Sequence, residues 1–208
     1  MRLSLDVKQI KEAEDVLRGL GRSVDPVLRG TLNSTGSYAR TNEFGPPLRK
    51  LFRRKGRVSR GLALKRAGTK RHEARIIAAS SGVEVPEYAR WGYTPISPTR
   101  AVVWVAGLNG HKVAAGFVNP AGSKRAPLRT RSSRKAKVAK LGGAQRDYRY
   151  NTARPETALG PSLAYWFQSV VSQGAIKRVN EFMLAEFDRR LNAEINKGAS
   201  DDAWRRPY

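Results

Sequence analysis

Positive charge is concentrated in two stretches of this 208-residue sequence, and their placement limits what the chain can fold into. Residues 49–75 hold twelve Lys or Arg against one acid, and residues 124–149 hold ten against one. Their net charges of +11 and +9 leave only +3 of the total +23 for the rest of the chain. Like charges four residues apart on a helix repel, so an isolated helix over the first stretch would be unstable. We expect this stretch to be partly disordered, neutralised by something it binds, or a mobile solvated loop.

Two helices are expected before the first basic stretch. Apolar residues from Val7 to Leu20 recur on one helical face, and Gly19 and Gly21 then end that helix. Asp25 can cap a second helix, with Pro26 in its first turn, and Gly45-Pro46-Pro47 marks its end. This second helix is rich in small and polar residues, which favours close packing on another helix of this chain or of a neighbouring subunit.

Short runs rich in β-branched residues follow and predict three or four mostly antiparallel strands. They cover 74–79, 82–85, 100–106 and 113–118. Asn109-Gly110 tolerates positive φ and predicts a hairpin turn between the last two strands. The two prolines in residues 93–99 favour an ordered loop or a sheet edge there.

The C-terminal part predicts a long amphipathic helix. Residues 163–171 are densely apolar, Gly174 is a possible break, and apolar residues then repeat every three to four positions from Ile176 to Ile195. We expect this helix to end near Gly198 and to cover one face of the sheet.

The fold class expected is therefore α+β, with N-terminal helices, a small mostly antiparallel sheet and a long C-terminal helix packed on it. Residues 1–199 would form a single domain with basic excursions at 45–73 and 119–149, and residues 200–208 a C-terminal tail. No run approaches the roughly 18–20 apolar residues of a membrane span, and the N-terminus has no apolar signal core. We expect a protein that is soluble and made in a cytoplasm, with no membrane contact.

Motifs for enzymatic chemistry are missing from the sequence. It lacks the phosphate-binding, dinucleotide-binding, zinc-protease and nucleophile-elbow patterns. There is no cysteine, and His72 and His111 lie far apart, so we expect no metal site and no cofactor. Only Glu84 and Glu87 lie near the expected sheet, so a metal-dependent nuclease is a distant alternative, and we expect no enzyme.

The basic stretches are the candidate binding site, because clustered Lys and Arg bind polyanions by releasing phosphate counterions. The alternatives are an acidic protein partner and simple solvation. The residues expected to make these contacts are first Arg49, Lys50, Arg53, Arg54, Arg57 and Arg60, and second Arg131, Arg134, Lys135 and Lys137.

Several short motifs, taken in order, resemble the phage minor tail protein Z family of tail-completion and head–tail joining proteins. Leu159-Gly160-Pro161-Ser162-Leu163 is similar to the Gly-Pro-Ser-hydrophobic motif that opens the family's C-terminal helix, and residues 150–155 resemble the approach to it. Residues 28–40, 64–67 and 116–118 resemble its N-terminal helix, its basic stretch and one of its strands. The sequence departs at Pro155-Glu156, where the family usually has Pro-Ile, and in its heavier basic loop at 124–149.

The resemblance implies a structural virion protein of a tailed phage, made in the host bacterial cytoplasm. It would complete the head-proximal end of the tail and join tail to head as a subunit of a ring, most commonly of six. Its partners would be further copies of itself, adjacent tail-terminator, tail-tube and head–neck proteins, and double-stranded DNA in the ring lumen. The alternative is a free, sequence-nonspecific nucleic-acid-binding protein, although the strands lack the paired exposed aromatics of an RNA-stacking sheet.

Overall fold

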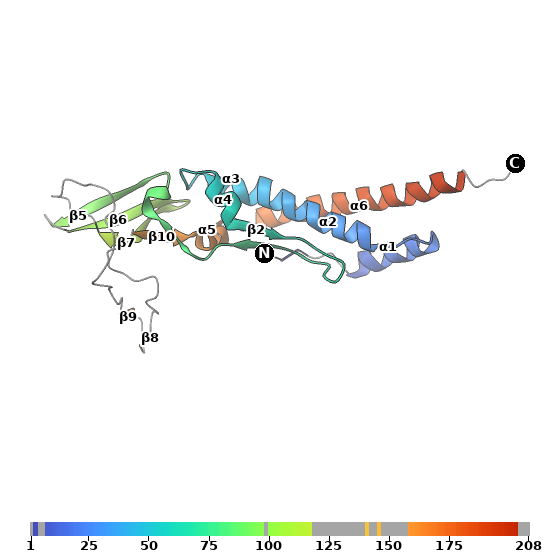
Figure 1. Cartoon of the computed structure of the whole chain (residues 1–208), viewed down its shortest axis with the longest axis horizontal. Coiled ribbons are helices and arrows are strands. Elements are labelled where there is room, and N and C mark those ends of the chain that lie inside the picture. The colour runs from blue at the N-terminus through green and yellow to red at the C-terminus, as the bar shows by residue number, and fades with distance from the viewer. Residues whose placement is uncertain are drawn as a thin grey trace. The chain divides into compact units, whose positions relative to one another are not determined.

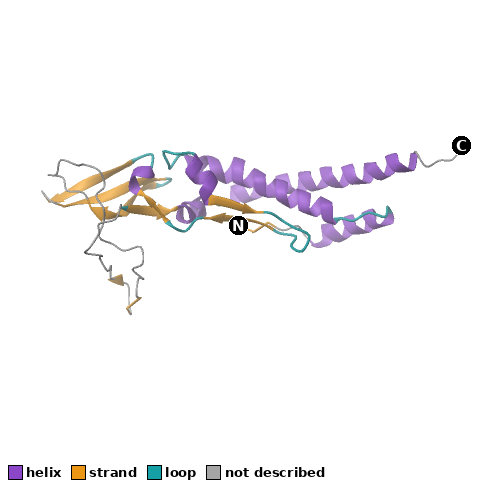
Figure 2. Ribbon diagram, viewed as in Figure 1, coloured by secondary structure: helices purple, strands orange, loops and turns teal. Residues whose placement is uncertain are grey.

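The computed structural model describes residues 2–3, 7–97, 100–117, 140–141, 145–146 and 158–203. A run of helices is followed by small antiparallel sheets and then by a long C-terminal helix, so the expected α+β class is confirmed (Figures 1 and 2). The residues cluster into two compact units. The first is drawn from Met1–Pro46, Ser59–Ala78 and Val170–Tyr208, and the second from Pro47–Val58 and Ala79–Ser169.

The first unit is built on helix α2 (Asp25–Tyr38), which packs along the C-terminal helix α6 (Gln173–Ala203). The α2 residues expected on one face, Leu28, Leu32 and Thr35, are all buried. Facing them, α6 buries Val179, Met183 and Phe187. The glycines of α2 allow close contacts within the chain. Gly30 lies against Arg190, and a Cβ on Gly36 would lie 2.7 Å from Cδ1 of Leu64.

Helix α1 (Val7–Gly19) ends as expected, because Gly21 adopts φ +66° just after it. The start of α2 differs in one detail. Asp25 is its first residue rather than its N-cap, and the N-cap position is held by Val24, which makes no side-chain capping hydrogen bond. Pro26 lies in the first turn as predicted.

The prediction that Gly45-Pro46-Pro47 ends this helix is wrong. The chain stays helical through a π-helical segment, η1 (Ala39–Phe44), and into α3 (Gly45–Arg49). Both prolines fall in the first turn of α3, where a missing N–H costs little. The π-helical segment just before the prolines has a wider turn than an α-helix, so the i→i−4 hydrogen bonds that a proline nitrogen cannot donate are not required there.

The first unit also holds a three-stranded antiparallel sheet in the order β1-β3-β2. Its strands are β1 (Arg2–Leu3), β2 (Leu62–Lys65) and β3 (Ala74–Ala78). Leu62, Ala74 and Ile76 are buried, whereas Ala63, Lys65 and Ile77 are exposed. The period-two alternation therefore continues into the basic stretch, and β2 is a strand where the sequence predicted a loop or disorder.

The second unit contains a five-stranded sheet in the order β4-β10-β7-β6-β5, with every pair antiparallel. The strands are β4 (Gly82–Glu84), β5 (Trp91–Ser97), β6 (Arg100–Gly107), β7 (Gly110–Phe117) and β10 (Leu159–Ser162). The Asn109-Gly110 hairpin is confirmed, with Gly110 at φ +89°. Residues 93–97 belong to β5, an edge strand, which is where a proline such as Pro95 is tolerated.

The remaining elements of the second unit are short. They are α4 (Gly56–Gly61), whose first half lies in this unit, the 3-10 helix η2 (Val85–Glu87), the pair β8 (Lys140–Leu141) and β9 (Gln145–Arg146), and α5 (Leu163–Val170). The C-terminal helix breaks at Val171-Ser172, two residues before the predicted Gly174, because the Ser172 hydroxyl accepts the Ala175 N–H at 3.2 Å. Helix α6 then runs to Ala203, past the expected end near Gly198 and into the expected tail.

Candidate polyanion-binding surface

The first basic stretch is divided between the two units. Residues 49–58 lie in the second unit and residues 59–75 in the first. Of the six cations predicted first, five therefore share the second unit, whereas Arg60 belongs to the first. The four predicted second, Arg131, Arg134, Lys135 and Lys137, lie outside the described residues.

Residues 50–55, here called the basic loop, are fixed by main-chain bonds rather than by a helix. The Arg53 N–H donates to the Glu87 carbonyl at 2.9 Å, and the Ala89 N–H donates to the Leu51 carbonyl at 2.9 Å. These bonds form an antiparallel bridge between Phe52 and Tyr88. An extended backbone avoids the i,i+4 repulsion that would destabilise a helix here.

Apolar residues just before and within this loop anchor it. Leu48, Leu51 and Phe52 are buried, and the Phe52 ring centroid lies 5.0 Å from that of Tyr88. Burial raises the pKa of Tyr88 to about 12, so its hydroxyl stays protonated at neutral pH. That hydroxyl accepts the Trp166 indole N–H at 3.0 Å and donates to the Pro161 carbonyl.

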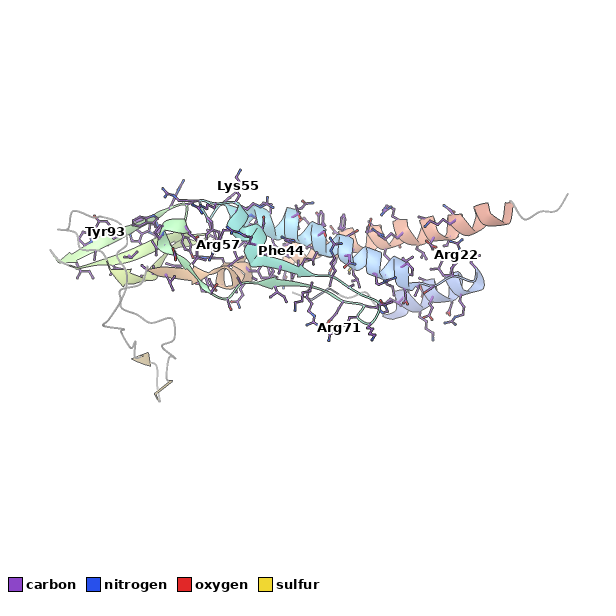
Figure 3. The ribbon with its side chains drawn as sticks, in the orientation of Figure 1. Arg22, Phe44, Lys55, Arg57, Arg71 and Tyr93 are labelled. Carbon is purple, nitrogen blue, oxygen red and sulfur yellow. The ribbon has the colours of Figure 1, made fainter. Side chains whose placement is uncertain are left out.

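The cations of the basic loop face solvent. Lys50, Arg53, Arg54 and Lys55 are exposed, and within the described part of the chain none of them has an ion-pair partner. Figure 3 shows the Lys55 side chain extending away from the ribbon. Four uncompensated charges on six residues repel one another, so an external anion would stabilise this loop.

The two flanking arginines differ from these four. Arg49 is half-buried and has an interaction of its own. Arg57 pairs with Glu87, with Nε 3.4 Å from Oε2. The sequence predicted these cations as one set but did not separate those paired within the described chain from those that are not, because Glu87 lies thirty positions away from Arg57.

Glu84 and Glu87, the acids of the nuclease alternative, line one hollow of about 580 Å³ with Arg57, Ser80 and Ser81. Arg57 offsets one of the two carboxylates. In the described residues no group of three or more His, Cys, Asp or Glu side chains is placed to hold a metal ion. None of the described helices is long and apolar enough to cross a bilayer.

A second set of cations was not among the predicted site residues. Lys65, Arg66, Lys70 and Arg71 lie on or beside the hairpin that joins β2 to β3, and all four are exposed. A signal for this hairpin is present in the sequence. Short apolar runs, residues 62–64 and 74–77, lie on both sides of Gly68-Thr69, as in two paired strands.

Comparison of the chain with protein-family models, with curated proteins and with solved structures found no match.

Proposed function

We propose that this chain is a non-enzymatic structural protein of a tailed-phage virion. It completes the head-proximal end of the tail and joins tail to head as one subunit of a ring, most simply of six. Its neighbours are the adjacent tail and neck proteins, and its basic surface contacts the leading end of the genome in the lumen.

The observation that carries this proposal is the basic loop. Its four free cations are held on an ordered backbone, and no acid in the described chain neutralises them. Contacts to phosphate position a protein on DNA without reading its sequence, which suits a component that holds whichever genome end is packaged.

The motif resemblance supports the virion assignment. Gly160-Pro161-Ser162 forms most of strand β10 and leads directly into α5. A Cβ on Gly160 would lie 2.8 Å from Cε2 of the buried Tyr88, and Pro161 supplies the carbonyl that accepts the Tyr88 hydroxyl. The motif therefore has a structural role in this chain, at the start of helix α5.

Neutralising the basic loop tests this proposal. We expect the variant Arg53→Gln/Arg54→Gln to bind a mixed-sequence DNA duplex more weakly, with the slope of log K against log salt smaller by about 1.8 for two lost phosphate contacts. The matched control is Lys11→Gln/Lys177→Gln, which removes two exposed cations from helices α1 and α6. Fluorescence anisotropy with a labelled duplex measures both.

Equal slopes for the two variants would mean that the basic loop is merely solvated. The free nucleic-acid-binding alternative predicts the same slope change as the ring. It differs in predicting a monomer in solution. The mass of the purified protein in solution distinguishes a monomer from a ring.

A further inference from the structure

The hairpin between β2 and β3 is held against helix α2 at two points. The Asn33 side chain on α2 clamps Ala67, accepting its N–H at 2.8 Å and donating to its carbonyl at 3.3 Å. His72, on the returning arm, lies 3.3 Å from the Asp25 carboxylate at the start of α2. Asp25 and Asn33 are eight residues apart, so the hairpin follows about 12 Å of the helix.

The turn of the hairpin is closed by its own backbone. The N–H of Gly68 donates to the Arg71 carbonyl at 3.0 Å, and the N–H of Arg71 donates back to Gly68 at 3.1 Å. These bonds and the Asn33 clamp give the cations fixed backbone positions. Figure 3 shows Arg71 at this hairpin. Lys65, Arg66, Lys70 and Arg71 have no ion-pair partner among the residues that the structure describes.

Arg66 also lines an open hollow of about 630 Å³ on the surface of α2 and α6. The other polar side chains of the hollow carry hydroxyl, amide or guanidinium groups and include no acid: Asn33, Ser34, Ser37, Tyr38, Thr41, Asn42 and Arg190. Arg190 shares the Glu186 carboxylate with Arg189, at 2.7 Å from Arg190, whereas Arg66 has no ion-pair partner among the described residues. Asn33 and Tyr38 already donate to Ala67 and Glu43, and the other hydroxyl and amide groups beside the Arg66 guanidinium are suited to an anion.

We propose that this hairpin and hollow form a second nucleic-acid-binding surface, which holds the phosphate backbone of a duplex. Arg66, Lys70 and Arg71 contact phosphates, and Asn33 is a positioning residue that keeps Arg66 at the rim of the hollow. The surface lies in the first unit, whereas the basic loop lies in the second. The hairpin surface is therefore proposed independently of the basic loop, and its binding to DNA does not require that the chain be a virion component.

The chemistry of the lining favours a duplex over an acidic protein or a single strand. Protein–protein interfaces have an apolar core, whereas protein–DNA interfaces are more polar and more positively charged. A single strand would need exposed aromatic faces on which bases can stack. The two aromatic rings here, Tyr38 and Phe182, stack on each other with centroids 4.1 Å apart, so each covers a face of the other.

The test compares Arg66→Gln/Lys70→Gln with the control Lys11→Gln/Lys177→Gln in the full chain. We expect the hairpin variant to reduce the salt slope of duplex binding by about 1.8 and the control to leave it unchanged. Asn33→Ala should weaken binding with no change in charge. Circular dichroism verifies that each variant keeps its fold. If Asn33→Ala does not fold, Arg66→Gln/Lys70→Gln still tests the proposal, because both of its changes are at exposed side chains.

Equal slopes for the hairpin variant and the control would overturn the proposal. So would displacement of the duplex by polyglutamate at a lower charge concentration than by unlabelled duplex, which would indicate an acidic protein partner. The basic loop is judged separately through Arg53→Gln/Arg54→Gln. If that variant binds like wild type while the hairpin variant binds weakly, the basic-loop claim fails and the hairpin claim stands.

Discussion

Tyr88 is the residue on which the second unit converges. Its ring is fully buried and packs on Phe52, and its hydroxyl joins the Trp166 indole to the Pro161 carbonyl. Glycine at position 160 leaves the space that this ring fills. A single buried phenol thus connects the basic loop, strand β10 and helix α5.

Replacing Gly160 by Ala tests this arrangement. The added Cβ would lie 2.8 Å from Cε2 and 3.1 Å from Cζ of Tyr88, and a buried ring has little room to shift. We expect a loss of about 1–3 kcal/mol in the free energy of unfolding, measured by urea denaturation. Gly56→Ala is the matched control, because its Cβ would meet nothing within 4 Å. A Gly160→Ala protein as stable as the control would contradict this packing.

Paired charges join α6 to α2 and η1 at the scale of elements. Arg178 on α6 holds Glu43 of η1 through two hydrogen bonds, at 2.9 and 2.7 Å. About two turns further along α6, Glu186 binds Arg189 and Arg190, and Arg190 donates to the Ser34 hydroxyl of α2 at 2.9 Å. Carboxylates on this interface are therefore expected to contribute stability only while ionised.

The pH dependence of the first unit follows from these pairs. Hydrogen bonds from Arg189 and then Arg190 lower the pKa of Glu186 from 4.5 to about 2. A lowered folded-state pKa gives stability that is present above pH 4.5 and is lost as pH falls toward 2. We expect the melting temperature to fall over this interval, and to fall less in Glu186→Gln, which starts lower at pH 7. Parallel melting profiles for the two proteins would contradict the assignment.

The elements that the sequence predicted are those with one strong local period. The α2 stripe, the α6 stripe and the Asn109-Gly110 hairpin each follow from neighbouring residues alone. The π-helical segment before Pro46 does not, since a helix can widen to admit prolines only when packing along its length holds it. Strand β2 was missed because the cations around it obscured the apolar positions Leu62 and Leu64.

The candidate site was predictable in the same uneven way. Charge clustering identified the basic loop, because uncompensated charge is visible without a fold. The ion pair between Arg57 and Glu87 could not be predicted, because it depends on the main-chain bridge between Phe52 and Tyr88. The hairpin cations were not predicted as a surface, because the Asn33 side chain that fixes the hairpin on α2 lies 34 residues from Ala67 in the sequence.

At the scale of the whole molecule, each of the two units carries a group of cations that have no ion-pair partner among the described residues. A ring of such chains would present both groups repeatedly, so that weak phosphate contacts add over many subunits. A monomer would present each group once. The number of chains in the particle therefore decides which function this charge serves.

The most direct measurement is the mass of the purified protein by light scattering, at low and at high salt. The ring account predicts a discrete multimer near six times the 23.1 kDa chain mass, or a monomer that assembles into a discrete multimer only when a tail or neck protein is added. A salt-independent monomer that binds any duplex with a steep salt slope, and that no such protein assembles, would contradict the ring.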